Sequence, residues 1–185
     1  MKLYIIQLII VLSVYSCNAQ LTTVNINTLN YNESCSGKYF KDIDGNFNNF
    51  IGSWKGIVNE SITFKVELFK YYLPEGKPPL DYSKDIITGK YYLIVNEGES
   101  SEQIICSGQN MDKVGFVIIA ESNDGTIMKG SIYDTCISKE LVSTFGNLSM
   151  NLGNKNTAHW GITRKGISLK GMDYVIPTNI ILTKQ

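Results

Sequence analysis

The chain has 185 residues, with 17 basic side chains, 17 acidic side chains and one histidine, so its formal net charge is zero. This length is typical of a single domain that can bury a sizeable core. The basic residues form no stripe and no cluster with interleaved aromatic residues, the pattern found in nucleic-acid-binding proteins. We therefore expect one globular domain that does not bind nucleic acid.

The N-terminal residues predict an export signal. One basic residue is followed by an apolar run from Leu3 to Val14, which is shorter than the roughly 20 apolar residues that a membrane-spanning helix needs. Ser16-Cys17 follows this run and resembles the bacterial lipobox, in which the cysteine is acylated and becomes the new N-terminus. This interpretation predicts a signal peptide at residues 1–16 and a lipid on Cys17. The alternative is an ordinary signal-peptidase cut after Ala19.

The stretch from Leu21 to Gly37 is polar and rich in Asn and Thr, as expected of a tether. We expect residues 17–37 to form this tether and residues 38–185 to form a single β domain. A lipid would place the protein at a membrane, so the expected location is the cell envelope, in the outer membrane or the periplasm. With the alternative cut, the protein would be soluble in the periplasm or secreted.

From Gly52 onward, the apolar residues follow a period of two. Ile62, Phe64, Val66 and Leu68 alternate with polar residues, as in a strand that is buried on one face. Alternating or continuous apolar runs predict further strands at 91–95, 114–120, 142–151 and 159–163.

Turn residues separate these runs. Asp124-Gly125 is the clearest candidate for a tight hairpin, and three prolines predict a surface loop from Tyr72 to Ser83. The strands recur every ten to fifteen residues, which predicts an all-β fold, an antiparallel meander that closes into a barrel.

Phe50-Ile51-Gly52-Ser53-Trp54 resembles the Gly-x-Trp motif that begins the lipocalin and avidin-like (calycin) barrels. The resemblance implies a lipocalin-like barrel in which Trp54 packs inside, at the start of the first barrel strand, and Arg164 lies against it. Two other interpretations remain open. Trp54 would be an ordinary core residue, and Arg164 would open a solvent-exposed turn before Gly166.

A second resemblance covers nearly the whole chain. It rests on Ser16-Cys17, Tyr39-Phe40-Lys41-Asp42, the stretch from Phe50 to Lys55, the stretch from Ile86 to Tyr91, and the ending from Ile176 to Gln185. These segments resemble a family of small exported, lipoprotein-like proteins of Gram-negative bacteria that is known only as a domain of unknown function. The resemblance implies export and a β domain. It supplies no activity, ligand or catalytic residue.

Three cysteines remain after Cys17, which allows at most one disulfide among them in an oxidising compartment. Cys106 and Cys136 lie in strand-like stretches, whereas Cys35 lies in the polar N-terminal stretch. The favoured pair is therefore Cys106–Cys136. The alternative is that all three are buried thiols.

The polar residues do not assemble into a recognisable catalytic or metal site. His159 is the only histidine, and a histidine on the polar face of a strand is usually surface decoration. Asp42-Ile43-Asp44-Gly45-Asn46 echoes part of a calcium loop but lacks the distal glutamate, because position 53 is a serine. We expect no catalytic residue, metal or cofactor.

The leading functional prediction is an exported, lipid-anchored, non-enzymatic barrel that binds a small apolar ligand or a partner protein. A structural or protein-interaction lipoprotein with a packed barrel and no ligand is the second prediction, and a hydrolase is the third. We expect a monomer whose membrane contact is made through the N-terminal lipid.

Overall fold

The computed structural model describes residues 21–30, 34–75, 81–108, 116–136, 144–164 and 174–185. These residues contain no α-helix. They form two short 3-10 helices, η1 (Ile26–Thr28) and η2 (Asn46–Asn49), and eleven strands. The strands are β1 (Thr22–Asn25), β2 (Lys38–Lys41), β3 (Gly52–Asn59), β4 (Ile62–Leu73), β5 (Ser83–Val95), β6 (Gln103–Gly108), β7 (Ile118–Glu121), β8 (Ile127–Asp134), β9 (Thr144–Asn154), β10 (Thr157–Arg164) and β11 (Asn179–Lys184).

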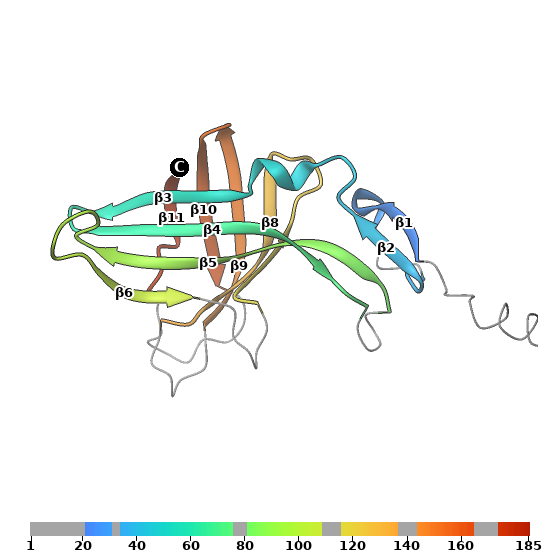
Figure 1. Ribbon diagram of the computed structural model, residues 1–185, viewed down its shortest axis with the longest axis horizontal. Helices are drawn as coiled ribbons and strands as arrows, with labels where there is room; N and C mark the ends of the chain where they lie inside the picture. Colours follow the sequence, from blue (N-terminus) through green and yellow to red (C-terminus); the bar gives the residue numbers. More distant parts are fainter. Residues whose placement is uncertain (1–20, 31–33, 76–80, 109–115, 137–143, 165–173) are drawn as a thin grey trace, which may run out of the picture.

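Eight of these strands form a closed antiparallel barrel in the order β3, β4, β5, β7, β8, β9, β10 and β11. The barrel closes where β11 pairs with β3, with Lys184 opposite Trp54. It is also closed by a short contact between β5 and β7, with Ile87 opposite Ala120. In Figure 1, β3, β4 and β5 run across the view while β8, β9 and β10 cross them steeply. The all-β, lipocalin-like barrel expected from the sequence is confirmed.

The barrel interior is filled by large side chains from two facing groups of strands. In one row, Trp54, Val66 and Tyr91 lie side by side on β3, β4 and β5. In the other, Trp160 and Met150 pair across β10 and β9, and Met150 pairs with Met128 on β8. Phe64 joins the rows, with its ring centroid 5.5 Å from that of Trp160 and 6.2 Å from that of Tyr91. The alternation read from the sequence thus directs these residues into one core.

The backbone pairing that joins β5 to β7 is short. The first half of β5 contacts β7, whereas its second half, from Tyr91 to Val95, pairs with β6. β6 is not part of the closed ring. Beyond Ile87, the described backbone ladder therefore does not join β5 directly to β7 and β8. Side chains make the connection there.

Part of the stretch predicted to be a tether, residues 17–37, is folded where the structure describes it. β1 pairs in parallel with β2, and β2 pairs in parallel with the start of β5. Ile26 and Cys35 are buried in the core. The polar composition of this stretch does not reveal that it folds, because a short pair of strands needs few apolar residues to pack against the core. Figure 1 shows β1 and β2 at one end of the molecule, beside the barrel.

The structure agrees with the loop prediction where it describes that segment, but the connection around Asp124-Gly125 runs from Ser122 to Thr126 and is longer than the predicted tight hairpin. β4 continues to Leu73 and β5 begins at Ser83, so the strands extend slightly into the loop expected from Tyr72 to Ser83. Asp124 and Gly125 lie in the connection between β7 and β8, and Gly125 has a φ of 70°. The Asp124 carboxylate accepts hydrogen bonds from Thr126 N (2.8 Å) and Ile127 N (3.0 Å), which fixes this turn.

Candidate functional site

Trp54 packs at the floor of the barrel, at the end marked by η2. It is fully buried, as expected, and its Nε1 donates a hydrogen bond to the carbonyl of Phe50 at 2.7 Å. Gly52 has a φ of 122°, and a Cβ there would lie 3.3 Å from Lys184 Cε. Glycine therefore allows both the backbone conformation and the close approach of the lysine.

In the described structure, a cation that lies over Trp54 is Lys184. Lys184 Nζ lies 5.2 Å from the centroid of the Trp54 ring and donates to the carbonyl of Asn49 at 3.1 Å. Lys184 N bonds Asn156 O, whereas the backbone of Arg164 pairs with Gly146. Asn156 and Arg164 are eight positions apart along the chain, and the predicted contact of Arg164 with Trp54 stays a prediction. The side chain of Arg164 lies outside the described structure.

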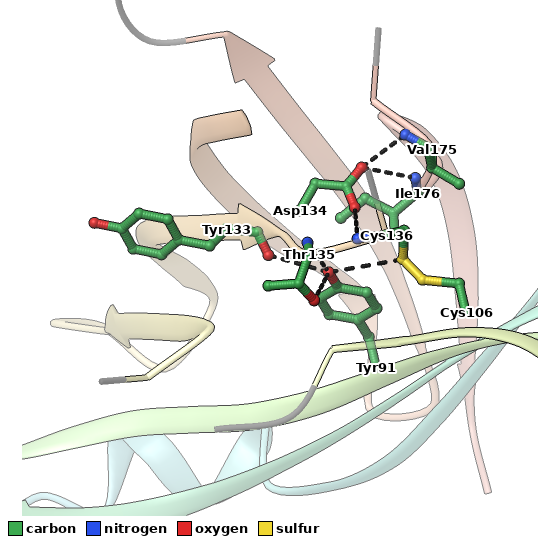
Figure 2. Close-up of a disulfide and its surroundings, with 8 residues drawn as sticks. All are labelled: Tyr91, Cys106, Tyr133, Asp134, Thr135, Cys136, Val175 and Ile176. Carbon is green, nitrogen blue, oxygen red and sulfur yellow. Dashed lines mark hydrogen bonds between the residues drawn. A yellow bond between two sulfur atoms is a disulfide. The ribbon is translucent and has the colours of Figure 1, made fainter. Parts of the chain in front are cut away.

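Cys106 and Cys136 form a disulfide at the opposite end of the barrel, with their Cα atoms 5.5 Å apart. The bond joins β6 to the residues that follow β8 (Figure 2). Cys35 is buried near β2, and its Sγ lies 3.7 Å from Asn30 O. The Cys106–Cys136 disulfide connects β6, which is not part of the ring, to the end of β8, which is.

Tyr91 reinforces this junction. Its hydroxyl accepts a hydrogen bond from Thr135 N (2.8 Å) and donates one to Tyr133 O (3.1 Å). Burial raises the pKa of the Tyr91 phenol to about 12. A Cβ at position 108 would lie 2.1 Å from the Tyr91 ring, so only glycine there lets the ring cross beneath β6.

Asp134 organises the chain beside the disulfide. It is fully buried, and its carboxylate accepts hydrogen bonds from the backbone N–H of Cys136 (2.9 Å), Val175 (2.6 Å) and Ile176 (3.2 Å). Figure 2 shows these three bonds converging on the carboxylate. The side chain therefore holds the segment that leads into β11 against the end of β8. Because all three donors are backbone groups, the arrangement stabilises the local conformation of the chain.

A second buried polar cluster lies between β2, β4 and β5. Lys70 Nζ lies 3.1 Å from an oxygen of Asp42 and 3.3 Å from an oxygen of Asp85. The Asp42 carboxylate accepts hydrogen bonds from Asn46 N and Phe47 N, and thus caps η2. Burial and a hydrogen bond to Asp85 raise the pKa of Tyr39. The motif that echoed a calcium loop thus forms a capped turn, with lysine as the counter-ion.

The remaining predicted groups stay apart from these clusters. His159 is exposed, and its Nε2 lies 2.7 Å from the Asn179 side-chain oxygen. In the described part of the chain, no group of three or more His, Cys, Asp or Glu residues is placed to hold a metal ion. Cys17 lies outside the described residues. Among those described, no helix is long and apolar enough to cross a membrane.

Sequence reasoning missed Lys184, Tyr91 and Asp134 as organising residues. A signal existed for Lys184, since a barrel that begins at Gly52 must close with its last strand beside its first. No comparable signal marks Asp134, because its three donors come from two segments that the sequence alone does not bring together.

The sequence profile of one family, described as a family of unknown function (DUF6705), matches residues 1–185. The chain belongs to DUF6705. This membership confirms the predicted domain of unknown function and covers the whole chain. Searches of curated proteins and of solved structures found no match.

Proposed function

We propose that this DUF6705 protein is an exported, lipid-anchored β-barrel that acts through its outer surface by binding a partner and does not catalyse a reaction. The observation that carries the proposal is the filled interior. Six large side chains that line it are fully buried, namely Trp54, Phe64, Tyr91, Met128, Met150 and Trp160. Small barrels either fill their interior with side chains or hold a ligand, and this packing favours the first arrangement.

Two surface hollows in the described part of the chain support an external site. One, of about 330 Å³, lies on the β7–β8 hairpin, and the other, of about 530 Å³, lies at the floor of the barrel. The linings of both include polar and charged side chains. An apolar ligand inside the barrel, the leading prediction from the sequence, would have to displace the core residues named above.

The interior is tested with benzene and with a long-chain fatty acid, by ligand-observed NMR on the purified protein. We expect neither to bind the wild-type barrel. Phe64→Ala is the matched control, because truncating the residue between Trp160 and Tyr91 leaves an apolar cavity that benzene can enter. Saturable fatty-acid binding to the wild type would overturn the packed-barrel proposal in favour of an internal ligand.

The anchor rests on the apolar N-terminal run and on Ser16-Cys17. Cells expressing the protein should incorporate labelled palmitate, and the intact mass should fit a mature chain that starts at acylated Cys17. Cys17→Ala should abolish labelling, whereas Cys35→Ser should retain it. An unacylated chain starting at Gln20 would refute the anchor but leave export in place. Full-length protein in the cytoplasm would refute export as well.

A further inference from the structure

The larger hollow lies where three turns meet at the floor of the barrel. Its volume is about 530 Å³, and it lies between η2, the β7–β8 turn and the β9–β10 turn, with Lys184 of β11 beside them. Ligand pockets of roughly 300–1,000 Å³ typically hold small molecules. A volume of this size accommodates a sugar ring with its substituents, and it exceeds what a bare inorganic anion would fill.

Hydrogen bonds between the turns hold the walls in place. Asn49 Nδ2 donates to Gly125 O at 2.8 Å, which joins η2 to the β7–β8 turn. Leu152 N donates to Thr126 O at 2.9 Å, which joins that turn to β9. Lys184 N donates to Asn156 O at 2.8 Å, which joins the β9–β10 turn to β11. The hollow is therefore preorganised, and little ordering is needed when a ligand binds.

The charges of the lining have one sign. Lys155 and Lys184 are its two charged residues, and no carboxylate lines it. Within the described structure, neither ammonium forms a salt bridge. The nearby Asp124 carboxylate is occupied by two backbone N–H groups and lines the other hollow. The hollow is thus a concave surface with two cations that have no carboxylate partner, which favours an anion.

The neutral lining is suited to a polyol. Asn48 is exposed and offers a side-chain amide, which can both donate to and accept from neighbouring hydroxyls. Leu152 gives an apolar surface for the carbon face of a sugar ring. We infer that this hollow binds an acidic saccharide, with the carboxylate or phosphate at Lys155 and Lys184 and the hydroxyls toward Asn48. This inference rests on the proposed function in one respect, which is that the binding site lies on the outer surface of the barrel.

The test is an NMR titration of the ¹⁵N-labelled protein at low salt with D-glucuronate, D-glucose 1-phosphate, D-glucose and inorganic phosphate. We expect one or both acidic sugars to shift the amide signals of Gly125, Gly153 and Lys155, with a dissociation constant of about 1 mM or below. Lys155→Gln should weaken binding about tenfold, because it removes a charge-assisted contact. Asn48→Ala should weaken it severalfold. Lys41→Gln, which removes an exposed lysine on β2, is the matched control and should change nothing.

Binding of glucuronate alone assigns a carboxylate ligand, and binding of glucose 1-phosphate alone assigns a phosphorylated one. Equal binding of neutral glucose, or of inorganic phosphate and its sugar ester, would overturn the inference. So would shifts away from the hollow, equal losses in Lys155→Gln and Lys41→Gln, or no shifts at all. Because the benzene and fatty-acid tests probe the interior, failure of this site is distinguishable from failure of the proposed packed barrel.

Discussion

Lys184 and Trp54 lie opposite one another where the last barrel strand meets the first, with the Lys184 ammonium 5.2 Å from the centroid of the buried Trp54 ring. The same ammonium donates to Asn49 O. One lysine thus links β11, β3 and η2, and it seals the floor of the barrel at its point of closure.

Replacing Lys184 tests this seal. Lys184→Met keeps a long apolar stem but removes the cation–π contact and the hydrogen bond, so it should lower the free energy of unfolding by about 1–2 kcal/mol. Lys184→Arg, which can also stack on the ring, should remain within about 0.5 kcal/mol of the wild type. Equilibrium unfolding in urea provides the measurement. A Met variant as stable as the exposed-site control Lys155→Met would show that the contact contributes nothing.

Trp54→Ala should be among the most destabilising single substitutions in the barrel. It removes a fully buried indole and its hydrogen bond to Phe50 O, so the expected loss is about 3–5 kcal/mol. Trp54→Phe keeps a ring but leaves the Phe50 carbonyl without this donor, and should cost about 1–3 kcal/mol. Thermal unfolding followed by far-UV circular dichroism ranks the two variants. A loss below about 1 kcal/mol for the alanine variant would contradict the role of Trp54 in the core.

The disulfide should contribute substantially to stability. Cys106 and Cys136 are 30 residues apart, and closing a loop of that size in the unfolded chain stabilises the folded state by about 3–4 kcal/mol in the chain-entropy model. The double variant Cys106→Ser/Cys136→Ser and the chemically reduced wild type should therefore unfold at similarly lower denaturant concentrations. Adding reductant to the double variant should have no effect. A reductant effect that persists there would implicate another cysteine.

The raised pKa of Tyr91 predicts that the protein loses stability at alkaline pH. Burial raises the pKa of the Tyr91 phenol to about 12 in the folded state, whereas an unperturbed tyrosine has a pKa of about 10, so above pH 10 the unfolded chain loses this proton first. The contribution of the neutral Tyr91 phenol to the free energy of unfolding is fully present below pH 10. It is lost as the pH rises toward 12, and the total loss is about 3 kcal/mol. Tyr91→Phe should be less stable than the wild type at pH 8, because Thr135 N loses its acceptor. Urea midpoints measured from pH 8 to 11.5 should show a shallower decline in Tyr91→Phe, and parallel declines would exclude Tyr91 as the source.

Local patterns in the sequence were sufficient for the main architectural predictions. The alternation from Ile62 to Leu68 predicts a half-buried strand because successive side chains point to opposite faces. The apolar residues after Gly52 predict a barrel, and the burial of Trp54 follows from its place at the start of the first strand. These inferences succeed because each depends on neighbours within a few residues.

The sequence was less informative for contacts that join distant segments. The contact of Lys184 with Trp54 depends on strand register, and register depends on how the whole ring closes. We interpreted the polar stretch before Gly37 as a tether, because composition alone does not indicate the parallel pairing of β1, β2 and β5.

The sequence by itself determined that this protein is a β domain with an apolar core, because side-chain alternation and turn chemistry are properties of the local chain. Only the tertiary structure decided that the interior is packed, that Cys106 bonds to Cys136, and that Lys155 and Lys184 share a hollow. Each of these depends on which strands become neighbours after closure. That choice is made by the combined packing and hydrogen bonding of all the barrel strands, and no single segment encodes it.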